Sequence, residues 1–212
     1  MALQYTVIPV TPFEQNCTLI WCDETDEAVV LDPGGNVERI LSALDSRGLQ
    51  LKKIWLTHAH IDHVGGVTEL LGRHPVPVEG PHRDDAFLIQ ALPQQGQMMG
   101  LAAVQPFEVD RWLEEGETVQ VGHQSLAILH CPGHAPGQIT FFHEPTRWAQ
   151  VGDALFQGSI GRTDLPGGDY AAAIASVKEK LFPLGDDVTV TPGHGPETTI
   201  GAERRMNPFF RD

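Results

Sequence analysis

Three imidazoles and one carboxylate fall within six residues of this chain, in the segment Thr57-His58-Ala59-His60-Ile61-Asp62-His63. Imidazole nitrogens and carboxylate oxygens are the ligands that zinc and related divalent metals take from proteins. In extended backbone, residues two apart point the same way, so His58 and His60 can bind one ion together. Asp62 and His63 are adjacent and diverge, so they suit a second ion better than the first. The spacing therefore indicates two metal ions.

Three further candidate ligands each lie in a turn that follows a predicted strand. His134 lies in CPGHAPG at 131–137, Asp153 in GDALF at 152–156, and His194 in PGHGP at 192–196. Each is flanked by Gly or Pro, which is typical of a shaped turn that presents one polar side chain. Together with the first motif these residues make seven ligands, enough for two ions that share one carboxylate.

The expected secondary structure places the first motif at the end of a strand. Residues 52–57 are apolar and β-branched after a basic start and predict a strand, and residues 64–71 predict the opening of a short helix. Open α/β sheets place their sites at the carboxyl ends of strands. Gly65 and Gly66 are expected to let the backbone pass close behind the site.

Further elements are expected on both sides of the motif. Strands are predicted at residues 5–10, 18–22, 28–32 and 188–190, and a helix at 37–47 with Asn36 as its N-cap. A long amphipathic helix is predicted at 169–182, because its apolar residues recur at helical spacing. The apolar face of that helix is expected to contain Ala171, Ile174, Val177 and Leu181.

The four motifs, taken in their order along the chain, resemble the metallo-β-lactamase superfamily, and within it the glyoxalase II-like hydrolases. The resemblance implies an α/β fold, an αββα sandwich with two sheets face to face, helices outside and the metal site at one edge of the two sheets. It also implies how the ligands divide: one ion held by His58, His60 and His134, a second by Asp62, His63 and His194, and Asp153 bridging the two together with a hydroxide.

The likeness extends to the short, single-domain type of this family, through SIGRTDLPGGD at 159–169 and NPF at 207–209. Larger family members carry a C-terminal helical domain that supplies much of the glutathione binding. Since this chain ends at Asp212, a single domain over residues 1–212 without that addition is expected. A content of 41% hydrophobic residues over 212 residues suffices for one substantial core.

Net charge and cysteine content indicate the class of partner and the cellular compartment. The net charge is −14, from 14 basic and 28 acidic residues, which argues against nucleic acid because nucleic acid needs a basic surface. No apolar run reaches membrane length, and no basic segment followed by an apolar stretch marks a secretory signal. The three cysteines, an odd number, fit a reducing cytoplasm. We expect a cytoplasmic enzyme with a small-molecule substrate; the oligomeric state is not predicted.

Hydrolysis of a thioester suits this ligand set. Two divalent ions lower the pKa of a shared water toward neutrality and so supply hydroxide, and a thiol with a pKa of about 8.5 leaves readily as thiolate. Asp153, as the bridge, and Asp62, as the group that orients the nucleophile, are the predicted catalytic residues. The resemblance implies S-lactoylglutathione or a related acylglutathione thioester as substrate. Zinc is the first expectation for both ions, with iron or manganese as alternatives.

Arg162 is the predicted substrate-binding residue. It lies nine residues after Asp153 in a Gly-rich loop, and a guanidinium binds a carboxylate such as those of glutathione through two parallel hydrogen bonds. The alternative is that Arg162 pairs with Asp164 or Asp169 and only shapes the loop.

Two other functions stay open. Persulfide dioxygenases share the first motif and a GRTD-like stretch, seen here at 161–164, and would use a single iron held by His58, His134 and Asp153. His194 argues against this alternative, because it completes a second site that a mononuclear enzyme does not need. A non-catalytic metal-binding protein is the second alternative.

Overall fold

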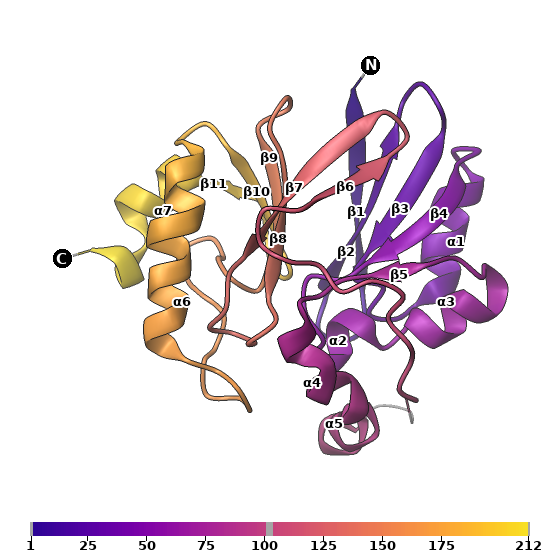
Figure 1. Cartoon of the computed structure of the whole chain (residues 1–212), viewed down its shortest axis with the longest axis horizontal. Helices are drawn as coiled ribbons and strands as arrows, with labels where there is room; N and C mark the ends of the chain where they lie inside the picture. Colours follow the sequence, from indigo (N-terminus) through magenta and orange to yellow (C-terminus); the bar gives the residue numbers. More distant parts are fainter. Residues whose placement is uncertain (1, 101–103, 212) are drawn as a thin grey trace.

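The computed structural model of this chain describes residues 2–100 and 104–211, which form two β-sheets and the helices around them (Figure 1). The first sheet has the order β1-β2-β3-β4-β5, with β1 (Leu3–Val10), β2 (Gln15–Cys22), β3 (Glu27–Leu31), β4 (Gln50–Trp55) and β5 (Val78–Glu79). The second has the order β11-β10-β9-β8-β7-β6, with β6 (Thr118–Val121), β7 (Gln124–His130), β8 (Ile139–His143), β9 (Trp148–Gly152), β10 (Thr189–Pro192) and β11 (Thr198–Thr199).

The two sheets pack face to face with helices on their outer faces (Figure 1). α1 (Val37–Asp45) and α3 (Val67–Arg73) cover the first sheet, and α6 (Tyr170–Ser176) and α7 (Ile200–Met206) cover the second. The short helices α2 (Ile61–Val64), α4 (Ala86–Gln90) and α5 (Leu92–Met99) gather at one end of the sandwich. The αββα sandwich expected from the sequence is confirmed. Among the described residues, no helix is long and apolar enough to cross a lipid bilayer.

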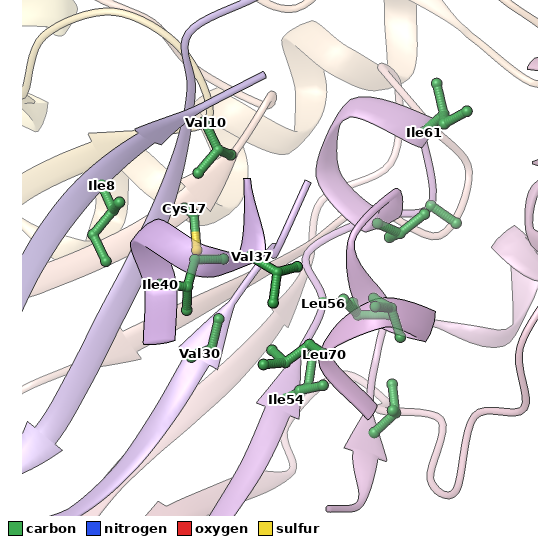
Figure 2. Packing of buried hydrophobic residues seen from close by; sticks show 14 of the residues in the cluster. Ile8, Val10, Cys17, Val30, Val37, Ile40, Ile54, Leu56, Ile61 and Leu70 are labelled. Carbon is green, nitrogen blue, oxygen red and sulfur yellow. The ribbon is translucent and has the colours of Figure 1, made fainter. Parts of the chain in front are cut away.

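Three apolar clusters fill the three interfaces of the sandwich. Figure 2 shows the first, in which Val37 and Ile40 of α1 face Cys17 and Val30 of the first sheet. Between the sheets, Trp55 stacks on Phe141 with ring centroids 5.2 Å apart. Val177 and Leu181 pack with Val151 and Val190 between the second sheet and its helices. Since both faces of β8 and β9 are covered, every residue of these strands is buried.

Strand direction brings the ligand-bearing turns to one edge. β7 and β9 are both antiparallel to β8, and β9 is parallel to β10, so the carboxyl ends of β7, β9 and β10 lie together. The turns that leave these ends carry His134, Asp153 and His194. In the first sheet, the segment that leaves β4 carries the first motif.

The predicted helices are present, but their details differ from the expectation. The segment 64–71 divides into α2 and α3, and a Cβ at Gly66 between them would lie 2.7 Å from the carbonyl oxygen of Pro33, so only glycine fits there. Asn36 precedes α1 in a left-handed conformation and does not cap it; its Oδ1 accepts a hydrogen bond from the backbone N–H of Thr11 instead.

The predicted helix at 169–182 is α-helical only over α6. It continues as a π-helical turn at Val177–Leu181 and a 3-10 turn at Phe182–Leu184. Asp169 caps its start, since its Oδ1 accepts a hydrogen bond from the N–H of Ala172. The expectation for Ala171 was wrong: it is exposed, and Ala173 takes the buried position on that face.

Candidate metal centre

The first cluster consists of His58 and His60, from the segment between β4 and α2, and His134, from the turn between β7 and β8. One nitrogen of each ring lies within 4.8 Å of a nitrogen of the others. His60 Nδ1 and His134 Nε2 face each other at 2.8 Å. The fold thus gathers the three histidines that the resemblance assigns to one ion, from positions up to 76 residues apart in the printed sequence.

The second cluster consists of Asp62 and His63, on α2, and His194, in the turn after β10. His194 Nε2 lies 3.1 Å from Asp62 Oδ2. The expected divergence of Asp62 and His63 is not seen: His63 Nε2 lies 4.0 Å from Asp62 Oδ2, and the rings of His63 and His58 have centroids 4.1 Å apart.

Asp153 lies between the two clusters. Its Oδ2 is 3.4 Å from His134 Nε2 and 3.8 Å from His194 Nε2, and its Oδ1 is 3.3 Å from His63 Nε2. One carboxylate thus faces nitrogens of both clusters, which is the arrangement that a bridging ligand needs.

The residues present fit two divalent ions. His58 Nε2 and His60 Nε2 are buried and have no hydrogen-bond partner among the described residues, and His63 Nε2 has only Asp153 Oδ1 beside it, at 3.3 Å. Buried polar atoms in folded proteins are almost always paired, and ligation of metal ions would satisfy these nitrogens. Imidazoles and carboxylates are the ligands that divalent transition metals take from proteins, each in its deprotonated form.

The environment sets these protonation states. Burial, assisted by the neighbouring imidazole of His63, holds the pKa of His58 well below its usual range. Burial and His134 lower the pKa of His60 to about 3. Burial alone would raise the pKa of Asp153, but His63 and His134 outweigh it and hold this pKa well below its usual range.

His63 behaves differently from the other ligand histidines. Burial lowers its pKa, but the carboxylates of Asp153 and Asp32 outweigh burial and raise the pKa well above its usual value. The raised pKa favours the protonated ring in the metal-free protein, so a metal ion that binds Nε2 of His63 competes with a proton.

Asp32 is a functional residue that the sequence analysis missed. It is fully buried, and its carboxylate accepts hydrogen bonds from the N–H of Thr57 (2.7 Å), the hydroxyl of Thr57 (2.6 Å) and Nδ1 of His63 (2.9 Å). These bonds leave Nε2 of His63 directed at the cluster. The sequence does contain a signal for Asp32, because it ends a predicted strand, and the predicted ligands also lie at or just after the ends of strands.

Asp85 joins the two turns of the first cluster. It is fully buried, and its carboxylate accepts hydrogen bonds from the N–H groups of Ala59 (2.9 Å) and Gly137 (2.5 Å). On α5, Gln95 Oε1 accepts a hydrogen bond from the N–H of Ile61 at 3.0 Å. Both residues support the first motif, and no local pattern in the sequence marks them.

Asn16 holds the turn that carries His194. Its Nδ2 donates hydrogen bonds to the carbonyl oxygens of Pro192 (3.0 Å) and Gly195 (2.8 Å). Its backbone N–H donates to the carbonyl oxygen of Gly193 (2.7 Å). Since Asn16 lies on β2 and the turn follows β10, this contact ties the two sheets together at the second cluster.

Arg162 contacts the metal centre with its backbone carbonyl group, not with its side chain. Its carbonyl oxygen accepts a hydrogen bond from Nδ1 of His134 at 2.8 Å, which leaves Nε2 of that ring free for the cluster. Its guanidinium is exposed and forms two parallel hydrogen bonds to the carboxylate of Asp164, at 2.7 and 2.8 Å. This pairing is the alternative that the sequence analysis left open for Arg162.

A further group of metal-type side chains, His82, Asp84 and His130, lies apart from the seven ligands. The rings of His82 and His130 stack with centroids 4.1 Å apart and planes 20° apart, and His130 Nε2 donates to the carbonyl of Pro136. The lone pair of an imidazole lies in the ring plane, so two nearly parallel rings cannot both direct it at one ion. These residues do not form a second metal centre in this arrangement.

Comparisons with known proteins identify the family of this chain. The metallo-beta-lactamase superfamily profile matches residues 10–194. Hydroxyacylglutathione hydrolase GloC of Haemophilus influenzae is 47% identical over 205 residues, 96% of each chain. The solved structure of BLEG-1 B3 metallo-beta-lactamase has a TM-score of 0.91 and 34% identity, with 99% of this chain and 100% of that chain covered. TTHA1623 in a di-iron-bound form has a TM-score of 0.88 and 40% identity, with 96% of this chain and 99% of that chain covered. ETHE1 from Myxococcus xanthus has a TM-score of 0.79 and 27% identity, with 97% of this chain and 83% of that chain covered. The chain belongs to the metallo-beta-lactamase superfamily.

Proposed function

We propose that this chain is a metal-dependent thioester hydrolase that cleaves S-lactoylglutathione or a related acylglutathione thioester. The observation that carries the proposal is the complete second cluster beside the first, with Asp153 facing both. The similarity to a hydroxyacylglutathione hydrolase supports the substrate class. We propose two divalent ions per chain, zinc in the first place; the di-iron-bound neighbour supports iron as the alternative.

The residues of the site have separate tasks in this reaction. Two bound divalent ions would lower the pKa of a water toward neutrality and polarise the thioester carbonyl. Asp153 stays ionised and holds the two clusters at a fixed separation. Asp62, with a side chain 15% exposed, is open to solvent and can accept a hydrogen bond from the attacking water and orient it. The leaving thiol, with a pKa of about 8.5, departs as thiolate without a general acid.

We propose that Arg162 binds a carboxylate of the glutathione moiety. Its pairing with Asp164 shows a guanidinium already held in the geometry that receives a carboxylate, and substrate would take the place of Asp164. Arg162→Ala should then raise KM for S-lactoylglutathione several-fold at nearly unchanged kcat, whereas Asp164→Ala should leave KM equal or lower. If the pair only shapes the loop, the two variants should show the same losses.

We also propose a single domain over residues 1–212 and a cytoplasmic location. The three apolar clusters share the same two sheets, which supports one cooperative unit. The cysteines Cys17, Cys22 and Cys131 are free and buried, which suits a reducing compartment.

One assay tests the proposed reaction. Purified protein with two ions per chain should release free thiol from S-lactoylglutathione without consuming oxygen. A protein that binds metal but shows no turnover of this or other acylglutathione thioesters would instead fit the non-catalytic alternative.

A persulfide dioxygenase is the second candidate. Its three iron ligands are also together here, since His134 Nε2 lies 3.4 Å from Asp153 Oδ2 and the rings of His58 and His134 have centroids 4.8 Å apart. His194→Ala separates the two candidates. The hydrolase should lose second-site metal and most activity, whereas a dioxygenase with one iron should keep oxygen uptake and sulfite formation from glutathione persulfide.

A further inference from the structure

Two buried polar residues at the C-terminal end of the described chain take no part in the proposed reaction. Glu203 lies on α7 and is 2% exposed, and Asn207 directly follows α7 and is fully buried. Burying a carboxylate and an amide is costly unless both are hydrogen-bonded, so their partners indicate what they hold in place.

Their partners are the backbone of a turn after β9. Asn207 Nδ2 donates to the carbonyl oxygen of Ser159 (2.9 Å) and to Glu203 Oε2 (2.9 Å). Glu203 Oε2 also accepts from the N–H of Gly158 (2.8 Å). Phe156 and Ser159 close the turn through reciprocal backbone hydrogen bonds of 3.0 and 3.2 Å. The end of α7 thus fixes residues 156–159.

The same segment continues directly to the metal centre. Three residues after Ser159, the carbonyl oxygen of Arg162 accepts the hydrogen bond from Nδ1 of His134. Between Ser159 and Arg162, the backbone at Gly161 packs tightly against the metal centre. A Cβ at this position would lie 2.1 Å from the carbonyl oxygen of Asp153 and 2.9 Å from His134 Nδ1. We therefore expect a shift of the turn to move the carbonyl that orients His134.

We propose that Glu203 and Asn207 are positioning residues that fix the Arg162 carbonyl and, through it, the direction in which His134 Nε2 points. Groups that orient a metal-ligating histidine typically change metal affinity by roughly 10- to 100-fold when they are removed. This inference rests on the proposed metal centre, and it assigns a role to the C-terminal NPF stretch that the reaction itself leaves unexplained.

Asn207→Ala tests the inference, with Thr198→Val as the matched control. The hydroxyl of Thr198 donates to Oε1 of Glu203, whereas the turn and Asn207 use Oε2, so the control removes a bond to the same carboxylate without touching the turn. Zinc affinity is measured by competition with a chromophoric chelator, and the imidazole of His134 is followed by NMR of ¹⁵N-histidine-labelled protein. Asn207→Ala should weaken one of the two ions at least about tenfold and shift the Nδ1–H signal of His134. Thr198→Val should leave both readouts near those of the wild type.

Glu203→Gln, which keeps the side-chain volume, is the second variant if Asn207→Ala does not fold, and it should shift the same readouts in the same direction. Unchanged affinities and an unchanged His134 signal in the folded variants would overturn the inference, as would equal losses in Thr198→Val. Absence of zinc binding by the wild type would overturn the metal centre instead. In that case the His134 Nδ1–H signal of the metal-free proteins still decides whether the end of α7 orients this ring.

Discussion

Asp85→Asn is expected to remove much of the loss of stability that the metal-free protein suffers between about pH 5 and pH 8. Asp85 is fully buried beneath the first cluster. Burial raises the pKa of its carboxyl from 3.8 to about 7, although the N–H groups of Gly137 and Ala59 oppose this shift. Ionisation of this carboxyl is therefore less favourable in the folded state than in the unfolded state.

The pKa shift sets the direction and the size of the effect. A group whose folded pKa lies above its unfolded pKa stabilises the fold below the unfolded pKa, and this contribution disappears as the pH rises through the folded pKa. At about 1.4 kcal/mol per pH unit, the shift corresponds to about 4 kcal/mol in all. Roughly 3 kcal/mol of this is lost between pH 5 and pH 8, and the remainder is already lost below pH 5.

Urea unfolding of wild type and Asp85→Asn, followed by tryptophan fluorescence with a chelator present, measures this difference. The free energy of unfolding of the wild type should fall relative to that of the variant by roughly 3 kcal/mol from pH 5 to pH 8. The titrating histidines occur in both proteins and cancel. The variant's side-chain amide has one acceptor oxygen fewer than the carboxylate, and the hydrogen bond lost with it adds only an offset that does not depend on pH. Two parallel curves would refute the reasoning, since they would mean that Asp85 has the same pKa in both states.

Three further outcomes are expected at the metal centre. Asp153→Ala should sharply lower metal content and activity, since Asp153 faces both clusters; two tightly retained ions would contradict the bridging role. Asn16→Ala should weaken the ion bound by His194, because Asn16 Nδ2 holds the carbonyls on both sides of that residue; chelator competition measures the loss. Zinc added to the metal-free protein near pH 7 should release at least about one proton per chain, because the raised pKa of His63 favours the protonated ring until metal binds. A pH dye in weak buffer detects the release, and its absence would show that His63 is neutral.

The sequence predicted the candidate metal ligands because the signals are local. His58 and His60 share a direction through the extended backbone between them, and His134, Asp153 and His194 each stand beside Gly or Pro in a turn. The order of these motifs was specific enough to predict the αββα sandwich, which the structure confirms. The start of α6 was also predictable, since an Asp cap acts within a few residues.

The tertiary structure decided how the ligands are oriented and supported. Asp32, Asp85, Asn16 and Asn207 bond to groups that are 25 to 176 residues away along the chain, so the sequence does not show these contacts, although Asp32 ends a predicted strand and Asn207 begins the NPF stretch. Ala171 was assigned to the wrong face because the rotation of α6 about its axis is fixed by packing on the second sheet, not by its own periodicity. The sequence by itself thus determined which groups are candidate metal ligands, since that depends on residue type and local turns. Which buried polar groups orient them was settled only when the two sheets came together, because a hydrogen bond depends on distances that folding alone sets.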